Sequence, residues 1–122
     1  MTVMPTTNKA LIIDDETDIC YLLGNILKQR DIEPVYAGSL HETDKIVQST
    51  EQFNYIFLDN HLPDGLGSTY ISKLKSRYPQ TLLIMITAHD SSEEKEIALK
   101  NGIDYFIGKP FSKEIIYKVM GK

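Results

Sequence analysis

The fold follows from the stretch YIFLDNHLPDGLG, residues 55–67. Its first four residues are apolar or aromatic, which is typical of a short strand buried on both faces of a sheet. Asp59 then ends the run, and Pro63, Asp64, Gly65 and Gly67 are turn residues that prevent the strand from continuing. A single acid in this position is most typical of a helix cap or a loop. An acid at the carboxyl end of a strand can also belong to a functional site, because open parallel sheets have their functional sites at that edge. The rest of the sequence distinguishes these two interpretations.

On both sides of this stretch, short apolar runs alternate with helical patterns along the chain. Strands are predicted over 10–13, 32–37, 54–58, 82–86 and 103–107, and helices over 17–30, 39–49, 68–78, 91–102 and from 112 to the end. Strict alternation with short loops predicts an α/β fold, (βα)5 and doubly wound, with right-handed crossovers. Pro34 favours an edge position for the second strand. We therefore expect a five-stranded parallel sheet of order 2-1-3-4-5, the flavodoxin-like arrangement.

Length and composition restrict what else the protein can be. A chain of 122 residues, 42% hydrophobic, supports one domain with a substantial core, expected over residues 9–120 after a loose N-terminal leader at 1–8. The net charge of −4 gives no basic footprint for direct nucleic acid binding. No apolar run approaches the ~20 residues that span a bilayer. The single Cys20 excludes an internal disulfide and fits a buried thiol in the reducing cytoplasm.

The ends of the predicted strands carry polar side chains. Asp14 and Asp15 follow the first strand, Asp59 the third, Thr87 the fourth and Lys109 the fifth. These four strands are neighbours in the predicted order, and their carboxyl ends meet at one edge of the sheet. Three carboxylates, a hydroxyl and an ammonium should therefore converge on one cleft.

This group of side chains suits phosphoryl chemistry. Three acids at close range repel one another unless one is protonated or a cation binds. Carboxylates without cysteine or paired histidine ligands favour a hard divalent ion, and a few carboxylates with several waters are typical of Mg²⁺. A cation, an ammonium and a hydroxyl around one carboxylate are what a phosphoryl group requires.

The chain resembles the receiver domain of two-component response regulators over nearly its whole length. The matching segments are Ile12-Ile13-Asp14-Asp15-Glu16, Asp59 followed by Leu62-Pro63-Asp64-Gly65, Ile86-Thr87-Ala88, and Gly108-Lys109-Pro110-Phe111. Their order and spacing are highly specific. Asn60 and Leu62 depart from the residues common in the family, and neither is expected to touch the chemistry.

The resemblance implies a signalling switch rather than an enzyme in its own right. Asp59 would be the phosphoacceptor, supplied by a sensor histidine kinase, a histidine phosphotransfer domain or small phosphodonors. Mg²⁺ would be held by Asp15, Asp59 and the main-chain carbonyl of His61, with Asp14 acting partly through water. Lys109 would pair with the phosphoryl group, and its bond to Pro110 is expected to be cis.

The resemblance also implies how the signal is read and erased. Thr87 would be the switch hydroxyl, and its movement would let Phe106 repack the face built from the helix at 91–102, the strand at 103–107 and the last helix. That face would control a downstream effector and could form a dimer. His61 and His89 stand at the two variable positions near the approach of the hydrolytic water. We expect them to obstruct it, because no acid is clearly placed to orient either ring for base catalysis.

Three other protein classes share part of this pattern. A flavin-binding relative of this fold would need a phosphate-binding turn after the first strand, where Asp14-Asp15-Glu16 stands instead. A haloacid-dehalogenase-type phosphatase carries its Asp-x-Asp signature after the first strand, whereas Asp59 follows the third and His61 takes the third place. A degenerate receiver, acting as a phosphorylation-independent interaction module, remains the alternative, although all five family residues are present.

Overall fold

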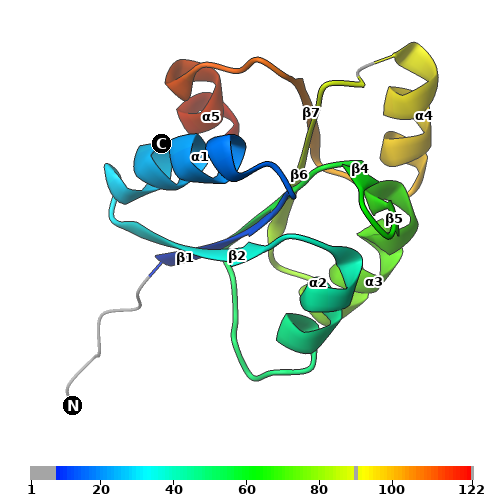
Figure 1. Ribbon diagram of the computed structural model, residues 1–122, viewed down its shortest axis with the longest axis horizontal. Coiled ribbons are helices and arrows are strands. Elements are labelled where there is room, and N and C mark those ends of the chain that lie inside the picture. The colour runs from blue at the N-terminus through cyan, green and yellow to red at the C-terminus, as the bar shows by residue number, and fades with distance from the viewer. Residues whose placement is uncertain (1–7, 90, 122) are drawn as a thin grey trace.

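Strands and helices alternate along the described part of the chain, residues 8–89 and 91–121, in this computed structural model (Figure 1). The strands are β1 (Asn8–Ile13), β2 (Ile32–Ala37), β3 (Tyr55–Leu58), β4 (His61–Leu62), β5 (Gly65–Leu66), β6 (Leu82–Thr87) and β7 (Tyr105–Gly108). The helices are α1 (Thr17–Lys28), α2 (Leu40–Val47), a 3-10 turn (Gly67–Tyr70), α3 (Ile71–Arg77), α4 (Ser92–Lys100) and α5 (Lys113–Met120). Of the leader expected over residues 1–8, residues 1–7 lie outside the described range and Asn8 begins β1.

The main sheet has five parallel strands in the order β2-β1-β3-β6-β7. Strands β4 and β5 form a separate hairpin and are not part of this sheet. Strands β6 and β7 are therefore the fourth and fifth strands of the sheet along the chain, and the order is the predicted 2-1-3-4-5. The flavodoxin-like, doubly wound prediction is therefore confirmed. Strand β2, which contains Pro34, lies at the edge and pairs only with β1.

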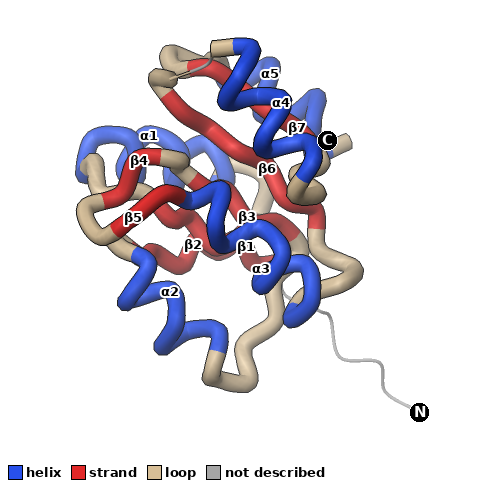
Figure 2. The backbone as a smooth tube through the Cα atoms, turned by 90° about the vertical axis from the view of Figure 1, so that its right-hand side faces the viewer, coloured by secondary structure: helices blue, strands red, loops and turns tan. Residues whose placement is uncertain are grey.

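The two faces of the sheet carry separate cores. Alternate residues of the strands pack with α2, α3 and α4 on one face and with α1 and α5 on the other. Figure 1 shows α1 and α5 together on one side of the sheet, and Figure 2 shows α2 and α3 on the other. Strand β1 illustrates the pattern, because Leu11 and Ile13 belong to the first core while Ala10 and Ile12 belong to the second. Burial on both faces explains why the central strands read as continuous apolar runs.

Three serines begin helices as the sequence predicted. The hydroxyls of Ser39, Ser91 and Ser112 accept main-chain N–H groups three residues ahead, at 3.0 to 3.2 Å. Helix α4 ends at Lys100, and two residues later Gly102 has a φ of 105°, which favours glycine. The N–H groups of Gly102 and Ile103 then bond to the carbonyls of Leu99 and Ala98, which closes the helix. This closure delays the last strand, so β7 begins at residue 105 rather than 103.

The loop after β3 differs from the prediction. Strand β3 does end at Leu58, as the turn residues predicted, but the loop contains two short strands that are not among the five predicted ones. The turn at Pro63 and Asp64 reverses the chain, so His61 pairs with Leu66 and Leu62 pairs with Gly65 in a short antiparallel hairpin. The helix predicted from residue 68 is likewise replaced at its start by the 3-10 turn. Among the described helices, none has both the length and the apolar character to cross a bilayer.

Candidate functional site

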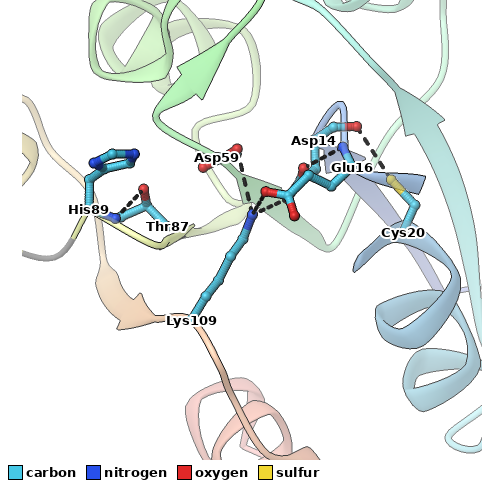
Figure 3. A network of polar contacts seen from close by, with 7 residues as sticks. All are labelled: Asp14, Glu16, Cys20, Asp59, Thr87, His89 and Lys109. Atoms are coloured by element: carbon cyan, nitrogen blue, oxygen red, sulfur yellow. Dashed lines mark hydrogen bonds and ion pairs between the residues drawn. The ribbon is translucent and has the colours of Figure 1, made fainter. Parts of the chain in front are cut away.

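The carboxyl ends of four neighbouring strands bring the predicted polar side chains together. Asp14 directly follows β1, Asp59 follows β3, Thr87 ends β6 and Lys109 follows β7. Figure 3 shows Lys109 extending toward Asp59 and Asp14 from the opposite side of the site. The parallel register aligns these strand ends, since Ile13 pairs with Leu58 and Thr87 pairs with Gly108. The predicted convergence is therefore confirmed for these four residues.

Lys109 is the only lysine or arginine among the described residues that pairs with Asp14 or Asp59. Its Nζ lies 2.9 Å from Asp14 Oδ2, 3.0 Å from Glu16 Oε1 and 3.6 Å from Asp59 Oδ2. The side chains of Lys109, Asp14 and Asp59 are 7%, 4% and 5% exposed. The single positive charge of Lys109 thus neutralises only part of the negative charge on the two buried carboxylates.

Burial sets the proton affinities of this group. It raises the pKa of the Asp59 carboxyl, and the neighbouring Asp14 charge raises it further while Lys109 opposes the rise. Desolvation likewise raises the pKa of Asp14. Burial alone would lower the pKa of Lys109, but its contacts with Asp14, Glu16 and Asp59 outweigh that effect and raise it. The site therefore favours an additional positive charge.

Asp15 completes a carboxylate cluster that suits a divalent cation. One oxygen from each of Asp14, Asp15 and Asp59 lies within 4.8 Å of the others, and Asp15 is exposed to solvent. All three donors are hard oxygens, and the exposed side leaves room for water ligands. The residues therefore fit a divalent ion of the Mg²⁺ and Ca²⁺ class.

Thr87 lies beside this cluster with its side chain fully buried. Its hydroxyl accepts the main-chain N–H of His89 at 3.1 Å, and its carbonyl accepts the N–H of Lys109 at 2.8 Å (Figure 3). The same threonine thus contacts the segment leading to α4 through its side chain and the lysine-bearing segment through its main chain. The bond between Lys109 and Pro110 is cis, as predicted.

Comparison with known proteins assigns the family. Residues 10–120 match the profile described as the response regulator receiver domain. The chain belongs to the response regulator receiver domain family. The response regulator protein PilR of Pseudomonas aeruginosa is 37% identical to this receiver domain over 102 residues, which is 84% of the chain and 23% of PilR. The chain spans between 22% and 49% of the length of its first curated relatives.

Solved structures support the same assignment for the receiver domain. A response regulator from Burkholderia pseudomallei, crystallised with a phosphorylated aspartic acid, a calcium ion and citrate, superposes with a TM-score of 0.87. It is 26% identical, and the match covers 93% of this chain and 66% of that one. The beryllofluoride-activated NtrC4 receiver domain dimer gives a TM-score of 0.82 at 33% identity, with 93% of both chains covered.

Asn60 has a structural role in the receiver domain that its sequence did not reveal. Its side-chain oxygen accepts the N–H of Ser68 at 2.8 Å, and its main-chain oxygen accepts the N–H of Gly67 at 2.7 Å. Gly67 lies so close to the Asp59 carbonyl that a Cβ atom there would overlap it. Asn60 and Gly67 therefore fold the hairpin loop back against the candidate phosphoacceptor. The glycine was a visible turn signal, whereas this partnership is long-range and left no pattern.

His61 and His89 lie against each other, and the prediction that no acid orients either ring is wrong. Their ring centroids are 3.8 Å apart, and the ring planes are tilted by 36°. Contrary to the expectation that no acid orients either ring, Glu94 Oε1 lies 2.8 Å from His61 Nε2. Glu94 was assigned only to the cap of α4. Its main-chain N–H does bond to Ser91, while its carboxylate reaches across to β4.

Phe106 and Cys20 lie at the margins of the site. Phe106 is half-buried on β7 and packs against the core that faces α2, α3 and α4. The Cys20 thiol donates a hydrogen bond to the Asp14 carbonyl at 3.3 Å, and burial raises its pKa to about 11 (Figure 3). The raised pKa favours the thiol over the reactive thiolate, and Cys20 is half-buried rather than fully buried as the sequence predicted.

Proposed function

We propose that Asp59 accepts a phosphoryl group from a sensor histidine kinase or a histidine phosphotransfer protein, with Mg²⁺ bound at the carboxylate cluster. The observation that carries this proposal is the buried Lys109 ammonium, held between Asp14 and Asp59 at the carboxyl edge of the sheet. The phosphorylated aspartic acid and the metal ion of the Burkholderia relative support it.

The side chains divide the transfer among them. An Asp59 oxygen attacks phosphorus, so an O–P bond forms as the N–P bond to the donor imidazole breaks. Lys109, 3.6 Å from Asp59 Oδ2, is within reach of a phosphoryl oxygen after a small movement. Asp14 keeps the ammonium in place. Mg²⁺, held by Asp15, Asp59 and the His61 carbonyl with Asp14 partly through water, would neutralise charge on the phosphoryl oxygens.

The remaining assignments concern the domain as a whole. The receiver domain comprises residues 9–120 and works in the cytoplasm as a switch that assists its own phosphorylation and dephosphorylation. Its partners are the phosphodonor protein and a downstream effector protein or domain. A net charge of −4 supports the absence of direct nucleic acid binding by this domain.

Phosphorylation by acetyl phosphate should require Mg²⁺. Chelation of divalent ions should abolish incorporation of label, and Asp15→Asn should weaken Mg²⁺ binding by about ten- to a hundredfold because one metal ligand is lost. Intact-protein mass after incubation with acetyl phosphate measures both effects. Equal labelling with and without Mg²⁺ would contradict the metal site. A folded protein that takes no label would favour the alternative, a phosphorylation-independent interaction module.

We further propose that Thr87 and Phe106 transmit the signal. A phosphoryl group adds ~1.5–2 negative charges beside Thr87. The Thr87 hydroxyl, which now accepts the N–H of His89, can turn to donate to a phosphoryl oxygen. Its displacement opens space toward Phe106 on the adjacent strand β7, because Thr87 pairs with Gly108 two residues beyond Phe106. The face formed by α4, β7 and α5 would then change.

Thr87→Ala should weaken this response, whereas Thr87→Ser should preserve it. A hydrogen bond to a charged group contributes about 1.5–3 kcal/mol, so its loss should lower the ratio of switched to resting states by at least about tenfold. Chemical shifts along β7 and α5, with and without beryllofluoride, report the two states. Similar changes in the alanine variant and the wild-type domain would exclude Thr87 as the switch.

The same face supports the proposed downstream contact. Ile97 and Leu99 of α4 and Tyr105 of β7 are 44%, 51% and 44% exposed, so both elements offer apolar surface to a partner. The NtrC4 relative is a dimer in its beryllofluoride-activated form. We propose that the face of α4, β7 and α5 contacts the effector or a second copy of this domain.

Replacing either histidine should shorten the life of the phosphoryl group. The rings of His61 and His89 lie against each other as a bulky pair, and Glu94 holds the His61 ring; we propose that the pair obstructs the water that attacks phosphorus. His61→Ala and His89→Ala should each speed dephosphorylation several-fold, with little dependence on pH between about 6 and 8. The exposed His41→Ala serves as the control. Slower loss in either variant would instead identify an oriented imidazole as the general base, an effect typically worth ~10²–10⁴-fold.

A further inference from the structure

A second cluster of metal-binding side chains lies outside the carboxylate site. His61 on β4, His89 after β6 and Glu94 on α4 each offer one ligand atom, and the three atoms lie within 4.8 Å of one another. Glu94 Oε1 is 2.8 Å from His61 Nε2, and the centroids of the two imidazole rings are 3.8 Å apart. His61 and the segment that contains His89 and Glu94 are distant in the sequence, and together they place two imidazoles and a carboxylate at the surface.

Glu94 carries an unsatisfied oxygen at this cluster. Its Oε2 is buried and has no hydrogen-bond partner among the described residues. Oε1, in contrast, is engaged by His61 and lies 3.4 Å from the side-chain amide of Asn60. Among the described residues, His61 is the only ion-pair partner of this carboxylate. A buried carboxylate oxygen without a donor is costly, and a bound cation is one of the few groups that removes the cost.

The donor set differs from that of the carboxylate site. Two imidazole nitrogens and one carboxylate oxygen suit Zn²⁺ and its neighbours, whereas Mg²⁺ prefers oxygen ligands alone. Bonds of about 2.0–2.1 Å in a tetrahedral site place ligand atoms about 3.3 Å apart. The three ligand atoms here lie within 4.8 Å of one another, and His61 Nε2 and Glu94 Oε1 are 2.8 Å apart.

Solvent can reach the cluster. His89 is exposed and the His61 side chain is 39% exposed. A surface pocket of about 450 Å³ opens beside them, lined by His89, Ser91, Glu93, Glu94 and Ile97. An ion can therefore enter, and water can supply a fourth ligand.

We propose that His61, His89 and Glu94 bind one transition-metal ion of the Zn²⁺ class, with a solvent molecule as the fourth ligand. The site shares no side-chain ligand with the carboxylate cluster and does not depend on phosphorylation. The main-chain N–H of His89 is bonded to Thr87, so the ion would join β4 and α4 to the segment that follows Thr87.

The test is a titration of the unphosphorylated chain with Zn²⁺ in the presence of excess Mg²⁺. Competition with a chromophoric chelator gives the affinity, and Co²⁺ in place of Zn²⁺ gives a visible spectrum that reports four-coordination. His61→Ala, His89→Ala and Glu94→Gln should each weaken Zn²⁺ binding by at least about tenfold. Unfolding midpoints of the metal-free variants verify that each one folds.

Two matched controls separate this site from other binding. His41→Ala removes the one remaining histidine, which is exposed on α2, and Asp15→Asn alters the carboxylate cluster; both should bind Zn²⁺ as the wild-type chain does. Wild-type affinity no higher than that of the folded His61→Ala variant would overturn the proposal. A loss of affinity in Asp15→Asn equal to that in His61→Ala would also overturn it, because the ion would then occupy the carboxylate cluster. Because no readout involves phosphorylation, the result is independent of the proposed role of Asp59.

Discussion

Asp59→Asn should abolish phosphorylation of the domain and also make its fold more stable. The amide cannot form an acyl phosphate, so acetyl phosphate should leave the variant unlabelled. Asp59 is 5% exposed, and its pKa is raised by burial and by Asp14, so its charge destabilises the folded state at neutral pH. Removing that charge should increase the free energy of unfolding by about 1 kcal/mol in the absence of Mg²⁺.

Intact-protein mass and urea denaturation measure the two effects. Asp18→Asn is the matched control, because Asp18 is an exposed aspartate in the first turn of α1. It should be labelled as the wild-type domain is. Labelling of Asp59→Asn to the wild-type extent would show that another residue accepts the phosphoryl group. A loss of stability in the same variant would mean that Asp59 contributes a favourable ion pair rather than a repulsive charge.

Lys109→Met should destabilise the domain by about 3 kcal/mol at pH 7. The substitution leaves Asp14 and Asp59 buried without their shared ammonium, and an uncompensated buried charge typically costs this much. The pKa of Lys109 is raised in the folded state. Its contribution is therefore fully present below the ordinary pKa of lysine and is lost only as the pH rises above it.

The pH dependence of the Lys109→Met effect has a defined sign. The pKa values of Asp14 and Asp59 are raised in the folded state, so the folded chain binds more protons than the unfolded chain as the pH falls. Without Lys109 these carboxyls should protonate more readily still. The difference in the free energy of unfolding between the wild-type domain and Lys109→Met should consequently become smaller as the pH falls from 7 to about 4. Excess Mg²⁺ at pH 7 should recover part of the loss.

Urea denaturation over this pH range provides the measurement. Lys113→Met is the control, because Lys113 is exposed at the start of α5 and its removal should change stability by no more than about 0.5 kcal/mol. If Lys109→Met were as stable as Lys113→Met at pH 7, Lys109 would not be compensating the buried carboxylates.

The sequence predicted the sheet and the residues at its carboxyl edge because both depend on local patterns. Apolar runs ended by Asp14, Asp59 and Lys109 mark buried strands and their ends, and strict alternation leaves few topologies. Pro34 also identified the edge strand from a local property, because proline has no N–H group to donate to a second neighbouring strand. The family motifs then indicated which strand ends carry the chemistry.

What the sequence could not predict depends on contacts between distant segments. Asn60 holds the loop to residues 67 and 68, and Glu94 spans 33 residues to reach His61. Glu94 also satisfied a local rule, the capping pattern with Ser91, which concealed its long-range partner. The β4–β5 hairpin was missed because each of its strands has two residues, too few to show an alternating pattern.

Direct mapping of the modified residue tests the central claim. The domain is incubated with acetyl phosphate and Mg²⁺, the acyl phosphate is trapped by borohydride reduction, and the peptides are sequenced by mass spectrometry. We predict one modified residue, Asp59, and no modification when Mg²⁺ is removed. Modification at Asp14 or Asp15, or a chain that stays unmodified although Mg²⁺ is bound, would contradict the account.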